Sequence, residues 1–124
     1  MKVNKYNLRV RSHFEASHTL DWHGTCSQLH GHTYHVELVI GANQLNENGI
    51  VMDLTVLKYI LNAILPDHRH LNDWITNPTV ERVTEYIGTL IQNKLIGLGY
   101  KLHQTQVTEV TVWETPTGGV TVTW

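Results

Sequence analysis

The residue types that can do chemistry in this 124-residue chain gather in one histidine-rich stretch. Six of the nine histidines lie within residues 13–35, and two of them belong to the triplet His30-Gly31-His32. Side chains two residues apart on a strand point to the same face, so these two imidazoles could grip one ion. A third histidine would complete the open ligand set of catalytic zinc sites. His18 is well placed for this role and His23 competes with it, while two solvated histidines at a strand start remain the alternative interpretation.

Three further groups carry reactive side chains. Cys26 lies in a polar loop four residues before His30, where it could be a metal ligand, a reactive thiolate or a small buried apolar residue. Asp67 beside His68 could hold the imidazole in one tautomer, although a polar loop with a capping aspartate would look the same. Glu114 could be an exposed carboxylate or an acceptor for two parallel N–H donors, such as the guanidine-like edge of a pterin.

The elements that must position these residues follow from hydrophobic periodicity. Alternating apolar residues predict strands over 7–14, 33–42, 110–114 and 120–124, and helical spacing marks two segments between them. Asp53 is the expected N-cap of the first helix and Pro66 its end, while Pro78-Thr79 opens the second. The order ββααββ predicts an α+β fold, with two helices on one face of a four-stranded antiparallel sheet. Open sheet edges favour oligomerisation.

Composition narrows the class of protein. Hydrophobic residues make up 41% and charged residues 16% of the chain, so we expect residues 1–124 to form one soluble domain. A net charge of -2 argues against a nucleic-acid partner, and no apolar run reaches the roughly 18 residues of a membrane span. A single cysteine excludes an internal disulfide framework. With no signal-peptide pattern at the N-terminus, a cytoplasmic location is expected.

Taken together, six segments resemble the motifs of one known family, in order and over nearly the whole chain. They are Phe14-Glu15-Ala16-Ser17-His18, Cys26-Ser27-Gln28-Leu29-His30-Gly31-His32, Gly49-Ile50-Val51-Met52-Asp53-Leu54, Asp67-His68-Arg69-His70-Leu71-Asn72, Pro78-Thr79-Val80-Glu81 and Glu114-Thr115. On these motifs the sequence is identified as a member of the 6-pyruvoyl-tetrahydropterin synthase superfamily.

Spacing favours one branch of this family. Three residues separate Cys26 from His30, which resembles the 6-carboxy-tetrahydropterin synthases of the queuosine pathway. Animal-type pyruvoyl synthases usually carry five residues there, and a third branch, which cleaves dihydroneopterin to a hydroxymethyl-pterin, has Glu in place of Cys26. The chain departs from the pattern at Leu54, Pro66 and Arg82, where Phe, Leu and Asn are usual. None of these changes removes a reacting group, although Pro66 is expected to shift the loop that follows it.

The resemblance implies a role for each matching residue. Zinc would be held by His18, His30 and His32, and Cys26 would be the general base. Asp67 and His68 would relay its proton and act as the acid partner. The pterin ring would be bound by Glu114, Thr79 and Thr115.

The resemblance also implies a reaction and an assembly. 7,8-Dihydroneopterin triphosphate would become 6-carboxy-tetrahydropterin, with loss of acetaldehyde and triphosphate. Subunits of the tunnelling (T-fold) type would form trimers, and two trimers would stack into a homohexamer with active sites between subunits. Two alternatives remain: a sister 6-pyruvoyl-tetrahydropterin synthase, and a non-catalytic zinc-binding scaffold built on the same fold.

Overall fold

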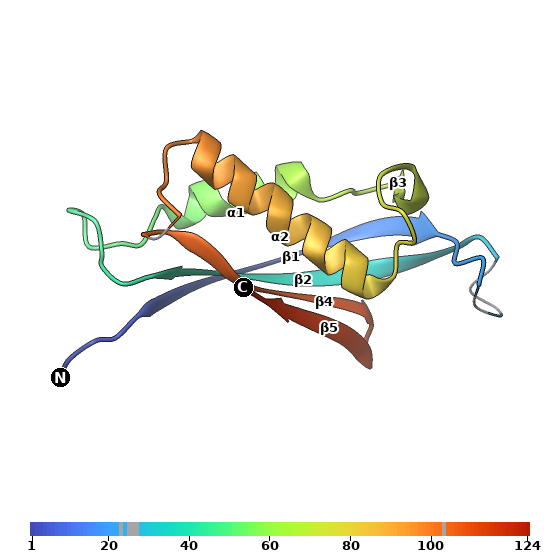
Figure 1. The fold of residues 1–124 in the computed structure, drawn as a ribbon, viewed down its shortest axis with the longest axis horizontal. Helices are drawn as coiled ribbons and strands as arrows, with labels where there is room; N and C mark the ends of the chain where they lie inside the picture. The colour runs from blue at the N-terminus through green and yellow to red at the C-terminus, as the bar shows by residue number, and fades with distance from the viewer. Residues whose placement is uncertain (23, 25–27, 103) are drawn as a thin grey trace.

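The computed structural model describes residues 1–22, 24, 28–102 and 104–124. A twisted sheet carries both long helices on one face, which confirms the expected α+β class (Figure 1). The elements in chain order are β1 (Tyr6–His18), β2 (His30–Ala42), α1 (Leu54–Ile64), β3 (Arg69–His70), the 3-10 helix η2 (Leu71–Asp73), α2 (Val80–Gly97), β4 (Gln106–Thr115) and β5 (Gly118–Thr123).

The sheet has five strands in the order β3-β1-β2-β4-β5, where the sequence predicts four. The additional strand β3 pairs in parallel with the end of β1, and all other pairs are antiparallel. Its two residues, Arg69 and His70, lie opposite Ala16 and Ser17. Two residues are too few to show an alternating pattern, so periodicity could not reveal this strand.

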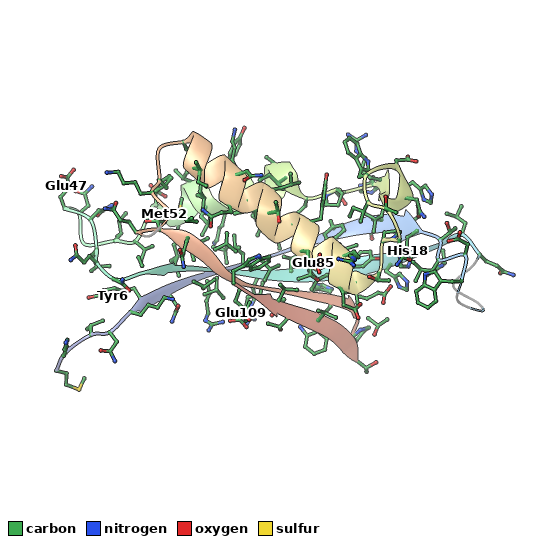
Figure 2. The ribbon with its side chains drawn as sticks, in the orientation of Figure 1. Tyr6, His18, Glu47, Met52, Glu85 and Glu109 are labelled. Carbon is green, nitrogen blue, oxygen red and sulfur yellow. The ribbon has the colours of Figure 1, made fainter. Side chains whose placement is uncertain are left out.

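The long β1–β2 pair forms the platform of the molecule. Its register runs from Tyr6 opposite Ala42 to His18 opposite His30, so both strands extend beyond the segments that periodicity predicts. Alternate side chains of both strands face the helices, and the rings of Phe14 and Tyr34 stack there with centroids 4.8 Å apart. At one end of this platform the inward-facing positions become histidines, and Figure 2 places His18 at that end, far from Tyr6.

Both helices begin where the sequence predicts, α1 at the expected cap Asp53 and α2 after Pro78-Thr79. The Asp53 side chain accepts hydrogen bonds from the amides of Thr55 and Val56 at the start of α1. The Thr79 hydroxyl accepts one from the amide of Arg82 at the start of α2. This second cap fixes the entry of α2 beside the histidine end of β1. Among the described residues, neither helix has the length and apolar character needed to cross a bilayer.

A side-chain amide links η2 to the residue that follows β1. Asn72 Oδ1 accepts from the Thr19 amide at 2.9 Å, and its Nδ2 donates to the Thr19 carbonyl at 3.0 Å. This pair of bonds fixes the chain direction immediately after His18. The link therefore holds the histidine end of β1 against the segment that connects the two helices.

We expect Asn72→Ala to lower the free energy of unfolding by about 1–2 kcal/mol, because two hydrogen bonds to the backbone are lost. Urea denaturation of the metal-free protein measures this change. Asn93→Ala, at an exposed position on α2, is the matched control and should change stability by no more than about 0.5 kcal/mol. Equal effects of the two substitutions would show that Asn72 has no special role in holding this end of the sheet.

Candidate metal centre

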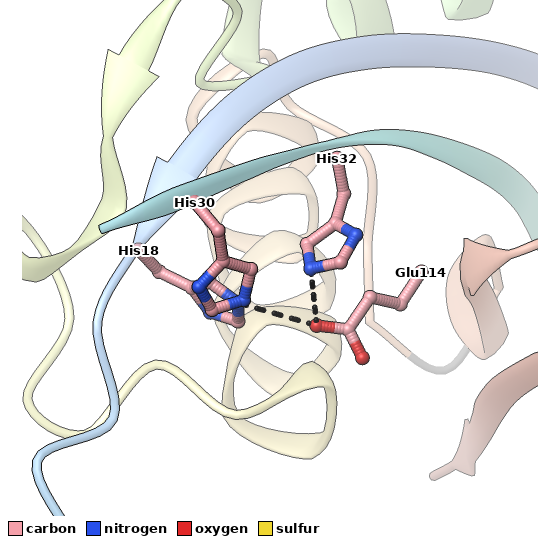
Figure 3. A group of neighbouring side chains, drawn as sticks. All are labelled: His18, His30, His32 and Glu114. Atoms are coloured by element: carbon pink, nitrogen blue, oxygen red, sulfur yellow. Dashed lines mark hydrogen bonds and ion pairs between the residues drawn. The ribbon is translucent and has the colours of Figure 1, made fainter. Parts of the chain in front are cut away.

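Four side chains converge at the histidine end of the sheet: His18 from β1, His30 and His32 from β2, and Glu114 from β4 (Figure 3). Each offers one ligand atom, and these atoms all lie within 4.8 Å of one another. His18 and His30 meet because they are register partners, and His32 joins them because it lies two residues along the same strand face. Among the described residues this is the group of His, Cys, Asp or Glu side chains able to surround one ion.

Backbone carbonyls fix which imidazole nitrogens face the centre. His18 Nδ1 lies 2.8 Å from the carbonyl oxygen of Pro78, and His30 Nδ1 lies 2.8 Å from that of Gln28. A carbonyl can only accept, so both Nδ1 atoms must carry hydrogen, and in the neutral rings both Nε2 atoms carry lone pairs. Yet His18 Nε2 and His30 Nε2 lie only 2.8 Å apart. Two lone pairs at this distance repel unless a proton or a cation is shared between them.

Two ligand-atom separations in the cluster match a tetrahedral zinc site, whereas the 2.8 Å between His18 Nε2 and His30 Nε2 is shorter than such a site requires. A tetrahedral ion with bonds of about 2.0–2.1 Å separates its ligand atoms by roughly 3.3 Å. Glu114 Oε1 lies 3.3 Å from His18 Nε2 and 3.4 Å from His32 Nε2. Imidazole nitrogens with a carboxylate oxygen are zinc ligands, and the Nδ1 contacts are the outer-shell bonds that orient such ligands. Glu114, expected to bind a pterin, thus lies directly against the predicted metal ligands.

The charges of the cluster are coupled. A hydrogen bond from His18, followed by the charges of His32, His18 and His30, lowers the pKa of Glu114 despite its partial burial. Burial works against a charge on His18, but its bonds to Glu114 and Pro78 raise its pKa overall. Burial is the main reason that the pKa of His32 is lowered, and the charges of His18 and His30 add to this effect. The carboxylate is therefore ionised and attracts positive charge into the histidine cluster.

Asp67 and His68 form a second constellation, at the β3 edge of the sheet. Asp67 Oδ2 lies 3.0 Å from His68 Nδ1, as expected for a carboxylate that orients an imidazole. The main chain of Glu15 hydrogen-bonds to both residues. Its amide donates to Asp67 Oδ1 at 2.9 Å, and its carbonyl accepts from the His68 amide at 2.6 Å. Its carboxylate Oε2 lies 3.5 Å from His68 Nε2. The sequence analysis assigned no role to Glu15, so sequence reasoning missed this contact.

A cavity of about 640 Å³ lies beside His68, at the ends of β1, β2 and β3. Glu15, Ser17 and Thr33, which line it, alternate along their strands with the inward-facing residues and so lie on the face of the sheet away from the helices. Within one chain, the cavity and the histidine cluster therefore lie on opposite faces of the sheet.

The other predicted site residues have different outcomes. Cys26 and the competing ligand His23 lie outside the described residues. The Thr79 hydroxyl caps α2, and the Thr115 hydroxyl accepts from the Thr117 amide at 3.4 Å in the β4–β5 turn. Both threonines remain predicted pterin contacts that the geometry does not test.

Comparisons with known proteins agree with the motifs. A model of the family described as 6-pyruvoyl tetrahydropterin synthase matches residues 7–123. The chain is 31% identical over 121 residues to 6-carboxy-5,6,7,8-tetrahydropterin synthase of Bacillus subtilis, covering 90% of this chain and 81% of that protein. It is 30% identical over 125 residues to dihydroneopterin monophosphate aldolase of Pyrococcus furiosus, covering 97% of this chain and 99% of that protein.

A solved structure extends the likeness to three dimensions. The Caenorhabditis elegans 6-pyruvoyl tetrahydropterin synthase superposes with a TM-score of 0.82 at 22% identity, covering 100% of this chain and 99% of that chain. At this level of identity the match concerns the fold, and it confirms the tunnelling fold expected from the motifs.

We expect His18→Ala to reduce bound zinc from about one ion per chain to almost none, because the remaining imidazoles cannot close the site. Elemental analysis after dialysis against a small excess of zinc measures this ratio. His13→Ala is the matched control, because His13 lies on the same strand but on the opposite, exposed face. His23→Ala should also keep zinc. Zinc loss with His23→Ala and retention with His18→Ala would mean that the third ligand is His23.

Proposed function

The chain belongs to the 6-pyruvoyl tetrahydropterin synthase family, and on that premise we propose that it is a zinc-dependent pterin lyase. The proposed reaction converts 7,8-dihydroneopterin triphosphate and one water to 6-carboxy-5,6,7,8-tetrahydropterin, acetaldehyde and triphosphate. Support comes from the name of the Bacillus subtilis relative and from the three residues between Cys26 and His30.

The observation that carries the zinc assignment is the pair of carbonyl contacts to Nδ1 of His18 and His30. These contacts turn the lone pairs of both Nε2 atoms towards one point, beside His32 and Glu114. Zinc in this position would supply a Lewis acid that stabilises negative charge on the substrate side chain as protons leave carbon. The protein's part is to orient the imidazoles, which the carbonyls of Pro78 and Gln28 do for His18 and His30.

We assign the proton transfers to Cys26 and to the Asp67–His68 pair. Cys26, four residues before His30, would act as thiolate base, since nearby positive charge favours the ionised form of a thiol. His68 would return a proton to the substrate. Asp67 at one ring nitrogen and Glu15 at the other restrict how the His68 imidazole can turn.

Glu114 is the proposed anchor of the pterin ring. Its lowered pKa keeps it ionised at neutral pH, and a carboxylate matches the paired N–H donors of the 2-amino and N3 positions. Thr79 and Thr115 are the proposed polar neighbours of the ring. For the triphosphate, Arg69 is the best candidate because it lines the cavity, whereas Arg9 and Arg11 are already paired with Glu37.

Assembly and pathway belong to the same proposal. We infer a homohexamer made of two trimers, in which one subunit brings the zinc ligands and Cys26 and its neighbour brings Asp67 and His68. The product would be a precursor of 7-deazaguanine bases such as preQ0 and queuosine. The expected setting is cytoplasmic, with a small-molecule pterin as the partner and neither nucleic acid nor membrane.

A second reaction has a specific observation in its favour. The Pyrococcus furiosus relative, named an aldolase for dihydroneopterin monophosphate, is matched over almost its entire length. An aldol cleavage would leave a hydroxymethyl-pterin in place of a carboxy-pterin. Cys26, which stands where the hydroxymethyl-forming branch carries Glu, favours the carboxy product. The sister pyruvoyl synthase reaction would retain all three side-chain carbons on the ring.

We expect the zinc-loaded protein to convert 7,8-dihydroneopterin triphosphate to 6-carboxy-5,6,7,8-tetrahydropterin, measured by mass spectrometry together with acetaldehyde. Cys26→Ala should keep about one zinc per chain and lose roughly 100- to 10,000-fold in turnover, the range for a missing acid or base. His13→Ala serves again as the control with intact chemistry.

Each other outcome points to a different conclusion. A 6-pyruvoyl or hydroxymethyl product would assign the chain to a sister reaction. Zinc loss in Cys26→Ala would make Cys26 a ligand and remove its role as base. Full zinc occupancy with no turnover of the wild-type protein would favour the non-catalytic scaffold.

A further inference from the structure

The hydroxyl of Tyr34 has no role in the fold or in the proposed chemistry described so far. Its side chain is fully buried on β2, two residues beyond His32. Its hydroxyl is one of two buried side-chain polar atoms in the described part of the chain without a hydrogen-bond partner. Leaving such a group unpaired costs about 1–3 kcal/mol, so an unpaired hydroxyl beside a functional cluster requires an explanation.

The surroundings of Tyr34 point to the metal centre. Its ring stacks on Phe14 and lies edge-on to His18 and His32, with centroid separations of 6.3 and 5.7 Å. The carboxylate of Glu114 contacts the same two histidines.

The present contacts of Glu114 require free histidine nitrogens. Its Oε1 atom lies against Nε2 of His18 and of His32 at 3.3 and 3.4 Å. An ion held by these nitrogens would take over their lone pairs, and a carboxylate that binds the pterin ring would have to leave them. Glu114 then has acceptor sites free for another donor beside the two of the pterin, and Tyr34 has a donor without an acceptor.

We propose that Tyr34 is a positioning residue for Glu114: in the metal-bound protein its hydroxyl donates to this carboxylate and keeps it turned towards the paired N–H donors of the pterin. The inference rests on the proposed function, because it assumes that Glu114 anchors a pterin. In this role Tyr34 would touch neither the reacting atoms nor the ion. This hydrogen bond explains why a tyrosine, and not a phenylalanine, occupies the apolar position beside Phe14.

Tyr34→Phe tests the proposal with readouts that separate positioning from packing. Thermal unfolding of the metal-free variant should occur at the wild-type temperature or above it, because there the hydroxyl has no partner to lose. Zinc content should stay at the wild-type level. Binding of unsubstituted pterin to the zinc-loaded protein, followed by its fluorescence, should weaken about 10- to 100-fold, as expected for the loss of a hydrogen bond to a charged group.

Two further measurements define the mechanism. KM should rise by a similar factor while kcat changes little, because the contact acts on ring binding before and during reaction alike. In a Glu114→Gln background, Tyr34→Phe should add almost nothing, because the acceptor that it positions has already been changed. Tyr100→Phe is the matched control. Tyr100 packs against the same core, but it follows the C-terminal end of α2. It is therefore remote from the start of α2, where the Pro78 carbonyl contacts His18.

Several results would overturn the proposal. These are a metal-free melting temperature lowered by more than about 4 °C, unchanged pterin affinity, loss of zinc, or an equal loss of affinity in both Glu114 backgrounds. Pterin binding does not depend on turnover. A wild-type protein that binds pterin without forming product would contradict the proposed reaction and still leave the role of Tyr34 testable.

Discussion

The contact between two imidazole nitrogens at 2.8 Å is the constraint on which the site depends. It arises because backbone carbonyls, which cannot change their hydrogen-bonding role, occupy Nδ1 of both His18 and His30. The two Nε2 lone pairs are thereby directed at each other in a buried place, where the repulsion is poorly screened. A proton on one of the two nitrogens or a cation between them relieves it, so the local backbone favours positive charge at this point.

Three separate parts of the fold must be correct for this constraint to exist. The β1–β2 register places His18 directly opposite His30, and a shift of one residue in either strand would turn that strand's cluster histidines to the exposed face. The start of α2, capped by Thr79, presents the Pro78 carbonyl to His18. The end of β4 supplies Glu114. Since the core under Phe14 and Tyr34 fixes the register, packing stability and the geometry of the candidate metal centre depend on the same residues.

Interactions between residues close in the sequence can be predicted from it, and those between distant residues cannot. The caps at Asp53 and Thr79 act over three residues, and the common face of His30 and His32 follows from strand geometry, so both are predictable. The direction of Glu114 is different: it lies at a register irregularity between Trp113 and Thr115, where alternation no longer tells which face a side chain takes. The contact of Glu114 with the histidines is visible only in the three-dimensional structure. The same holds for the hydrogen bonds of Glu15 to Asp67 and His68.

The loop after α1 shows how the chain accommodates an unusual residue. Pro66, where the family pattern has Leu, ends the helix and is followed by His68 at a positive φ of 57°. A left-handed conformation costs roughly 1–2 kcal/mol for a residue with a Cβ. Both main-chain polar groups of Glu15 bond to the loop: its carbonyl accepts from the His68 amide and its amide donates to Asp67. These bonds offset a cost of that size, so the edge of β1 holds His68 towards the cavity in a conformation that the loop alone would not favour.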